Sequence, residues 1–326
     1  MDVTARDVAR AAGVSESTVS RALAHSNAVA PSTRNKVHRI AQELGYTARA
    51  GASPARTGSI GVVVPDLANP FFAGLSKSLR AAASGSGLRT MIVDSDEDLR
   101  HERDAASYLA TQVDALVLCS PRCPDDELKG LVGKVPTVLT SRVVEGVPTI
   151  RIDESYSVGR VLAHLRALGH QRIAYVGGPA ASTSEIARSA GLVEAVAVAS
   201  DLDVIRVTNV TPSVIGGMGA ADEVLASGAS AVITFNDMVA LGLVAHALRR
   251  GTRIPEDLSV VGFDDVLIAE AAHPQLTTVA MPLRAVGSSA IRLLLEWLDT
   301  GTTPATPDPV RGELVVRHST APAPRS

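Results

Sequence analysis

The sequence predicts two unlike parts: a small all-α head, residues 1–46, and a larger α/β body, residues 59–326. Short helical patterns fill the head, whereas strand and helix patterns alternate along the body. The predicted strands are near-continuous apolar runs such as "ALVLC" and "SVVGF", which are typical of parallel strands covered by helices on both faces. With more than 250 residues, the body is expected to form doubly wound parallel sheets in two similar subdomains.

The head contains three helical patterns. Thr4 and Asp7 have the spacing of a capping box at the start of the first helix, which a glycine ends. A serine precedes the second helix, 16–24, and Pro31 begins the third, 31–44. Two short helices joined by a glycine turn predict a helix-turn-helix.

The outer face of the second helix is small and polar. Ser17, Ser20, Arg21 and Ala24 recur at helical spacing on the side opposite its apolar residues. In a helix-turn-helix such a face enters the major groove, where Arg21 would pair with a guanine or hold a phosphate. An ordinary three-helix bundle is the alternative interpretation of the same pattern.

Charge is unevenly distributed along the chain. Residues 1–58 carry a net charge of +4 and the remainder carries −7. A basic end on an acidic body suits a polyanionic partner, and a solvated basic surface explains the charge equally well.

The body has ten predicted strands. They lie at 59–64, 89–94, 114–119, 136–140, 149–152, 172–176, 203–208, 230–235, 258–263 and 277–281. Helical patterns fill the intervals between most of them. Because ligands in such folds bind beyond the carboxyl ends of the strands, polar and aromatic residues at those positions are ligand candidates.

Nine such residues follow the predicted strands. They are Asp66, Asn69, Phe71, Phe72, Arg142, Asp153, Arg188, Asn236 and Asp264. Carboxylates, an amide and a guanidinium together suit a neutral polyol, because each hydroxyl both donates and accepts hydrogen bonds. Each residue alone is explained as well by a helix cap or a salt bridge between subdomains; as a set, they favour a ligand site.

Several other protein classes lack support. The first strand is followed by no G-x-G-x-x-G, and the chain has neither a P-loop nor a G-x-S-x-G elbow, so we expect no enzyme and no cofactor. The histidines are scattered, and Cys119 and Cys123 have no accompanying metal ligands. With no signal sequence and no run of ~18 apolar residues, we expect a cytoplasmic protein that does not enter membranes.

The segments "DVARAAGVSESTVSRAL" (7–23) and "VAPSTRNKVHRIAQELGY" (29–46) resemble the DNA-binding domain of the LacI/GalR family of transcriptional regulators. The resemblance continues through "IGVVVPDLANPFF", "LGHQRIAYVGGP", "FNDMVALG" and "IPEDLSVVGFDD". It implies that Glu16 and Ser17 read bases. It further implies contacts to phosphates or bases from Ser15, Thr18, Ser20, Arg21 and Thr33, and we count Thr4 and Asn27 with these DNA-binding candidates.

For the body, the resemblance implies two lobes like those of periplasmic binding proteins. One lobe would comprise about 59–152 and 285–312, and the other about 153–284 with the C-terminal tail. Arg188, Asn236 and Asp264 match positions that bind the effector. This sequence departs from the family at Val210, where an aromatic residue is common, and at Met281, a pocket candidate that replaces a common glutamine.

Residues 47–58 are expected to form a linker in place of the family's hinge helix. That helix drives a leucine from each chain into the minor groove and kinks the DNA. Here the segment is shorter and has no leucine, and Pro54 disfavours helix in the preceding residue. Arg49 and Arg56 remain as candidate contacts to phosphates or a narrow minor groove, so we expect a weaker bend.

The sequence therefore predicts a transcriptional regulator, most simply a repressor, that binds a pseudo-palindromic operator as a homodimer. A small molecule, sugar-like or a related metabolite, would bind between the lobes and modulate it. The alternatives are a regulator with a degenerate pocket that responds to no small effector and a solute-binding protein.

Overall fold

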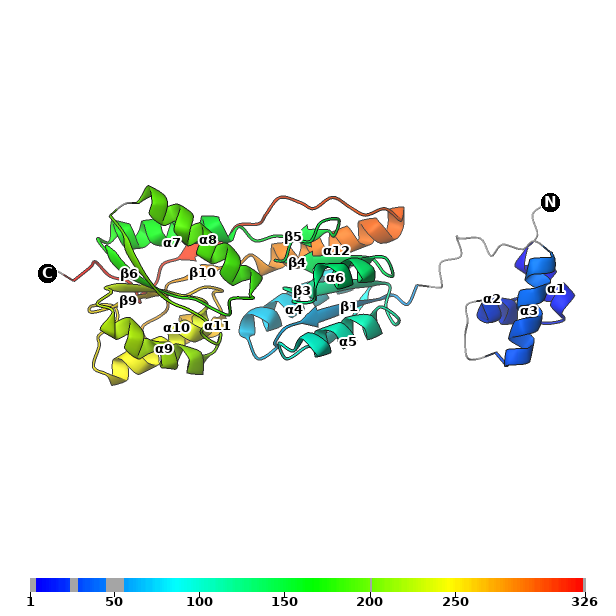
Figure 1. Cartoon of the computed structure of the whole chain (residues 1–326), viewed down its shortest axis with the longest axis horizontal. Helices are drawn as coiled ribbons and strands as arrows, with labels where there is room; N and C mark the ends of the chain where they lie inside the picture. The colour runs from blue at the N-terminus through cyan, green and yellow to red at the C-terminus, as the bar shows by residue number, and fades with distance from the viewer. Residues whose placement is uncertain (1–3, 24–28, 45–55, 200, 325–326) are drawn as a thin grey trace. The chain divides into compact units, whose positions relative to one another are not determined.

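The computed structural model describes residues 4–23, 29–44, 56–199 and 201–324 of the chain (Figure 1). It divides into two compact units, Met1–Arg56 and Thr57–Ser326. Among the described residues, no helix is both long enough and apolar enough to cross a membrane.

The N-terminal unit consists of α1 (Ala5–Ala12), α2 (Glu16–Leu23) and α3 (Pro31–Glu43). The predicted capping box is confirmed, because the Asp7 carboxylate accepts hydrogen bonds from the backbone nitrogen of Thr4, at 3.0 Å, and from its hydroxyl, at 2.6 Å. Gly13, at φ 67°, ends α1 in the left-handed conformation that glycine adopts without strain. Apolar residues of all three helices, including Val8, Val19 and Val37, form one small core.

The first half of the larger unit is built on a five-stranded parallel sheet, which we call lobe 1 together with its helices. The sheet has the order β2-β1-β3-β4-β5. Its strands are β1 (Ser59–Val64), β2 (Arg89–Asp94), β3 (Ala115–Cys119), β4 (Thr137–Thr140) and β5 (Thr149–Ile150). The helices are α4 (Pro70–Gly85), α5 (Leu99–Leu109), α6 (Asp125–Val132) and α12 (Leu283–Thr300), which returns from far along the chain to pack on α4.

Lobe 2 has a four-stranded parallel sheet of order β7-β6-β8-β9. Its strands are β6 (Arg172–Val176), β7 (Asp203–Val207), β8 (Ala231–Thr234) and β9 (Ser259–Val261). Helices cover both faces of this sheet in Figure 1. They are α7 (Glu154–Ala167), α8 (Thr183–Val198), α9 (Val214–Ala226), α10 (Asp237–Arg249) and the short α11 (Leu267–Ala271).

Each sheet has a hydrophobic core on each face. In β1, Ile60, Val62 and Val64 pack with α4 and α12, while Val63 packs with α5 and α6 on the other face. In lobe 2, one core lies beside α9 and α10 and the other beside α7 and α8. This two-sided burial is why the strands are continuous apolar runs, and it confirms the predicted fold class.

One pairing was not predicted. The segment expected as a strand at 277–281 forms β10 (Thr278–Ala280), which pairs antiparallel with β11 (Glu313–Val315). Isolated parallel bridges also join this segment to Val261 and Asp264, at the end of β9 and beyond it. Beside these strands, Asp153 donates its backbone N–H to the carbonyl of Val310 at 2.8 Å, so segments distant in sequence join where the chain passes between the lobes. The local apolar pattern of β10 is the same for either pairing, so the sequence did not distinguish them.

Candidate functional site

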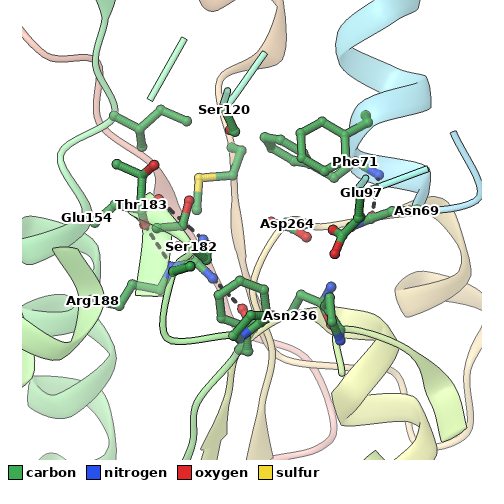
Figure 2. Close-up of a pocket in the computed structure, with 18 of the residues that line it drawn as sticks. Asn69, Phe71, Glu97, Ser120, Glu154, Ser182, Thr183, Arg188, Asn236 and Asp264 are labelled. Carbon is green, nitrogen blue, oxygen red and sulfur yellow. Dashed lines mark hydrogen bonds and ion pairs between the residues drawn. The ribbon is translucent and has the colours of Figure 1, made fainter. Parts of the chain in front are cut away.

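The main pocket lies where strands of both lobes end. It encloses about 660 Å³, part of it open to solvent. Lobe 1 contributes residues that follow β1, β2, β3 and β5, and lobe 2 contributes residues that follow β6, β7, β8 and β9. Figure 2 shows Glu154, Thr183 and Arg188 on one side of this space, Phe71 and Glu97 on the other, and Asp264 between them.

On the lobe 2 side, a buried ion pair holds the arginine of the pocket. The Arg188 Nε donates to Glu154 Oε2 at 2.9 Å, and both side chains are 5% exposed. Arg188 also donates to the backbone carbonyl of Phe235, and its guanidinium carbon lies 4.2 Å from the centre of the Phe263 ring. The arginine is therefore fixed in place from α7, β8 and β9 before any ligand arrives.

Two groups beside this pair lack internal partners. Asn236 caps α10 by accepting from the backbone nitrogen of Val239 at 2.9 Å, and its buried Nδ2 has no hydrogen-bond partner among the described residues. The Asp264 carboxyl group makes no hydrogen bond to the same residues, and its backbone has φ 109°, which is strained for a non-glycine residue. Burial raises the pKa of Asp264 well above its ordinary value, although the nearby Arg188 opposes the shift. The pocket thus offers one free donor and one free acceptor.

The lobe 1 side combines aromatic rings with a second ion pair. Phe71 and Phe72 meet edge to face, with centroids 5.1 Å apart. Arg122 Nη2 donates to Glu97 Oε1 at 2.9 Å, with side-chain exposures of 24% and 35%. This wall therefore offers an apolar surface and a solvent-accessible pair of opposite charges.

The structure brings together seven of the ten sequence-predicted pocket residues. These are Asn69, Phe71, Phe72, Arg188, Asn236, Asp264 and Met281. The other three do not line the pocket, because they are engaged nearby. Asp66 turns the loop after β1 by accepting from the backbone of Ala68, Arg142 pairs with Asp125 at 2.7 Å, and Asp153 caps α7 and pairs with Arg311 at 3.2 Å.

Sequence reasoning missed several residues of the lining. Glu154 directly follows the predicted Asp153, but it faces the pocket whereas Asp153 turns to the helix cap. The other missed polar residues are Glu97, Ser120, Arg122 and Ser182, which lie in loops after strands, and Thr183 and Ser184, which begin α8. Their position after a strand was the available signal, but the loops also contain polar residues that only cap helices.

The predicted DNA-binding residues lie mainly around α2. Glu16 and Ser17 are exposed in its first turn. The hydroxyl of Ser15 lies 2.8 Å from those of Ser17 and Thr18 and accepts from the Thr18 backbone nitrogen. The remaining candidates lie beyond the first turn of α2 or outside this helix. Thr4, Thr33 and Arg56 are described outside α2, Ser20 and Arg21 are placed on α2 by backbone alone, and Asn27 and Arg49 lie outside the described residues.

Other chemistry receives no support from the described part of the chain. No group of three or more His, Cys, Asp or Glu residues there is arranged to hold a metal ion. Cys119 and Cys123 are both buried free thiols, and burial raises the pKa of each to about 12, which leaves them protonated and unreactive.

Both parts of the chain match known protein families. Residues 162–320 match the periplasmic binding protein-like domain, which agrees with two lobes enclosing a pocket. Residues 4–48 match the bacterial regulatory proteins of the lacI family.

Similarity to characterised proteins extends over almost the whole chain. It is 33% identical to the HTH-type transcriptional regulator DegA of Bacillus subtilis, with 99% of each chain covered. The structure resembles a transcriptional regulator CelR–cellobiose complex (TM-score 0.72, 30% identity, 97% of this chain and 99% of that one). It also resembles the lac repressor dimer bound to operator and the anti-inducer ONPF (TM-score 0.73, 26% identity, 98% and 100%). The chain belongs to the LacI family and is a helix-turn-helix transcriptional regulator; these relatives are regulators rather than enzymes.

Proposed function

We propose that this regulator represses transcription by binding a pseudo-palindromic operator as a homodimer, and that a small hydroxylated molecule in the pocket controls the binding. The observation that carries the proposal is the presence, in one chain, of an exposed polar turn at the start of α2 and a pocket lined from both lobes. The operator-bound lac repressor dimer supports the dimer, and the cellobiose complex supports a sugar-like effector.

The proposal assigns a role to each part of the chain. Residues 1–46 bind DNA, residues 47–58 are a linker in place of the family's hinge helix, and residues 59–326 bind the effector and dimerise. Two-fold symmetry places two α2 helices on half-sites ~34 Å apart. A ligand that contacts both lobes favours one angle between them, and that angle changes how well both N-terminal units fit the operator.

The charges of the pocket favour a neutral effector. Both lining arginines are already paired, Arg122 with Glu97 and Arg188 with Glu154. Asp264 adds a carboxyl group that no described residue hydrogen-bonds, and burial favours its neutral form, so the lining has no unpaired cation. A phosphate or carboxylate would find no free cation there, whereas a hydroxyl can accept from Asn236 Nδ2 and donate to Asp264.

DNA binding is tested by capturing genomic fragments with the purified chain. We expect enrichment of one pseudo-palindromic sequence and a steep loss of affinity with salt, because phosphate contacts release counterions. Capture without sequence preference, or binding that does not respond to salt, would contradict the assignment of α2 as a recognition helix.

Effector binding is tested by calorimetry with cellobiose, lactose, ribose and neutral nucleosides, each paired with its phosphorylated form where one exists. We expect a neutral compound to bind and to change operator affinity, and Asp264→Asn to weaken it. Asp66→Asn is the matched control, because Asp66 lies outside the pocket and an asparagine can still accept from Ala68. If no compound changes operator affinity, the effector-independent alternative is favoured.

A further inference from the structure

The N-terminal unit contains an exposed ion pair that joins α1 to the start of α2. Arg6 Nε donates to Glu16 Oε1 at 2.9 Å. The two side chains are 75% and 54% exposed. An exposed pair of this kind contributes little to stability, typically about 0–1 kcal/mol, so both side chains can bind another partner at little cost to folding.

The carboxylates of Asp7 and Glu16 differ in their hydrogen-bond partners. The Asp7 carboxylate is engaged by Thr4 in the capping box, and that hydrogen bond lowers the pKa of Asp7. Glu16 accepts through Oε1 alone, from the side chain of Arg6, and its Oε2 makes no hydrogen bond to the described residues. Arg6 likewise uses only Nε, which leaves the two terminal nitrogens of its guanidinium fork without a hydrogen bond to those residues. The pair thus presents an acceptor and donors side by side.

This arrangement is complementary to one base pair. In the major groove a C·G pair presents the N4 amino donor of cytosine beside the O6 and N7 acceptors of guanine. A carboxylate accepts from cytosine N4, and an arginine fork donates to guanine. Adenine also offers an amino group, but its N7 acceptor lies beside that group and repels a carboxylate.

On the proposed DNA-binding function, we propose that Arg6 and Glu16 read one C·G base pair in each operator half-site as a unit. Glu16 accepts from the cytosine amino group, while Arg6 donates to the guanine and orients the glutamate. Arg6 has a second effect, because a carboxylate entering the groove is repelled by the phosphates and the guanidinium neutralises it. Glu16 is the first residue of α2, the part of a recognition helix that meets base edges.

The alternative for Arg6 is a phosphate contact with no role in sequence choice. The two roles predict different results. A phosphate contact lowers affinity for all sequences equally when it is removed, whereas a base-reading pair changes preference at one symmetric position.

The experiment is a selection from a randomised double-stranded DNA library with the full-length chain and four variants. These are Glu16→Gln, Arg6→Ala, Arg6→Lys and the control Arg10→Ala; Arg10 is an equally exposed arginine of α1, 76% exposed and 3.9 Å from Asp7. For the unmodified chain we expect a site with C·G at one symmetric position. Arg6→Ala and Glu16→Gln should each reduce the preference at that position by about tenfold or more while the other positions are kept.

The remaining variants make the result specific. Arg6→Lys keeps the charge but not the fork, so it should retain most of the affinity and lose most of the guanine preference. Arg10→Ala should leave the selected sequence unchanged. Glu16→Gln is nearly isosteric and tests the inference even if an Arg6 variant unfolds, which thermal unfolding would show.

Two results would overturn the inference. In one, the Arg6 and Glu16 variants select the same sequence as the unmodified chain, with affinity lowered equally at all positions or unchanged. In the other, the position that responds to Glu16→Gln is not C·G in the unmodified selection. A chain that selects no sequence at all would instead refute the proposed DNA-binding function.

Discussion

The two walls of the pocket contain the same kind of ion pair in opposite surroundings. In lobe 2, Arg188 and Glu154 meet at 2.9 Å and are 5% exposed; in lobe 1, Arg122 and Glu97 meet at the same distance but are 24% and 35% exposed. Equal distances therefore do not imply equal roles. The buried pair is part of the core of lobe 2, where an unpaired charge is costly, whereas water can replace either partner of the exposed pair.

This difference predicts different roles for the two lobes in ligand binding. Lobe 2 holds its polar groups in a fixed arrangement, with Arg188 also bonded to the carbonyl of Phe235 and stacked on Phe263. The polar groups of lobe 1 lie on loops, and the pair Arg122–Glu97 is partly exposed, so we expect them to adjust around a ligand. We expect lobe 2 to set the position of the ligand and lobe 1 to complete the enclosure. The following predictions test this contrast, from the largest expected effect to the smallest.

Arg188→Ala should be the most damaging change. It leaves the Glu154 carboxylate buried without its partner, which should lower the free energy of unfolding by about 3–5 kcal/mol in urea denaturation. The double variant Arg188→Met with Glu154→Leu, which removes both charges and keeps volume, should recover most of that loss. A cost below about 1 kcal/mol for the single variant would show that the pair is not structural.

The same contrast explains what could be predicted from the sequence. Apolar runs such as Ile60 to Val64 predicted the strands because burial on both faces leaves a direct pattern in composition. Residues at strand ends predicted part of the lobe 2 wall, where Asn236 and Asp264 line the pocket; Arg188, which also lines it, lies inside α8.

The lobe 1 wall was harder to predict for a geometric reason. Glu97 reaches the pocket from a loop residue with φ 54°, a conformation that residue spacing does not reveal. Asp153 and Glu154 are adjacent and both acidic, and only the helix that begins between them decides that the first residue caps α7 and the second faces the pocket. A one-residue choice of this kind depends on three-dimensional direction rather than on composition.

Gly217→Ala should have the next largest effect, in the packing of α9 against α10. A Cβ at Gly217 would lie 2.0 Å from the carbonyl oxygen of Val239, so the backbone must move, at a cost of about 1–3 kcal/mol. In lobe 1, a Cβ at Gly287 would first meet the Ser78 hydroxyl, at 2.7 Å, and should be better tolerated because part of the clash is with a side chain. Gly219→Ala is the control on α9 itself, with no atom within 4 Å, and should be neutral or slightly stabilising by thermal unfolding.

Lowering the pH should destabilise lobe 2, because His170 is buried there. Its ring nitrogens bond the Ser230 hydroxyl at 2.8 Å and the Ala321 carbonyl at 3.0 Å, and burial lowers its pKa below the ordinary value of 6.5. Because the folded state favours the neutral ring, His170 contributes to the free energy of unfolding in full above pH 6.5. This contribution is lost as the pH falls through the lower pKa of the folded state.

The measurement is the free energy of unfolding as a function of pH for the unmodified chain and for His170→Gln. The variant should not show the loss of stability at acidic pH that we assign to His170. Its stability at neutral pH should be lower if the hydrogen bond to Ala321, in the C-terminal segment, is weakened. Replacing the exposed His101 of lobe 1 with glutamine is the matched control. If the two variants give the same pH profile, the acidic loss does not arise from the buried histidine.

Arg122→Ala should have the smallest effect on stability and gives the sharpest test of the contrast. Its partner Glu97 is 35% exposed and keeps its contact with water, so the free energy of unfolding should fall by only about 0–1 kcal/mol. If lobe 1 completes the enclosure around the ligand, the same variant should nevertheless weaken effector binding by calorimetry, so binding and stability separate at Arg122 but not at Arg188. A stability loss at Arg122 as large as that at Arg188 would mean that both walls are rigid parts of their lobes, and the adjustable side of the pocket would then have to lie elsewhere.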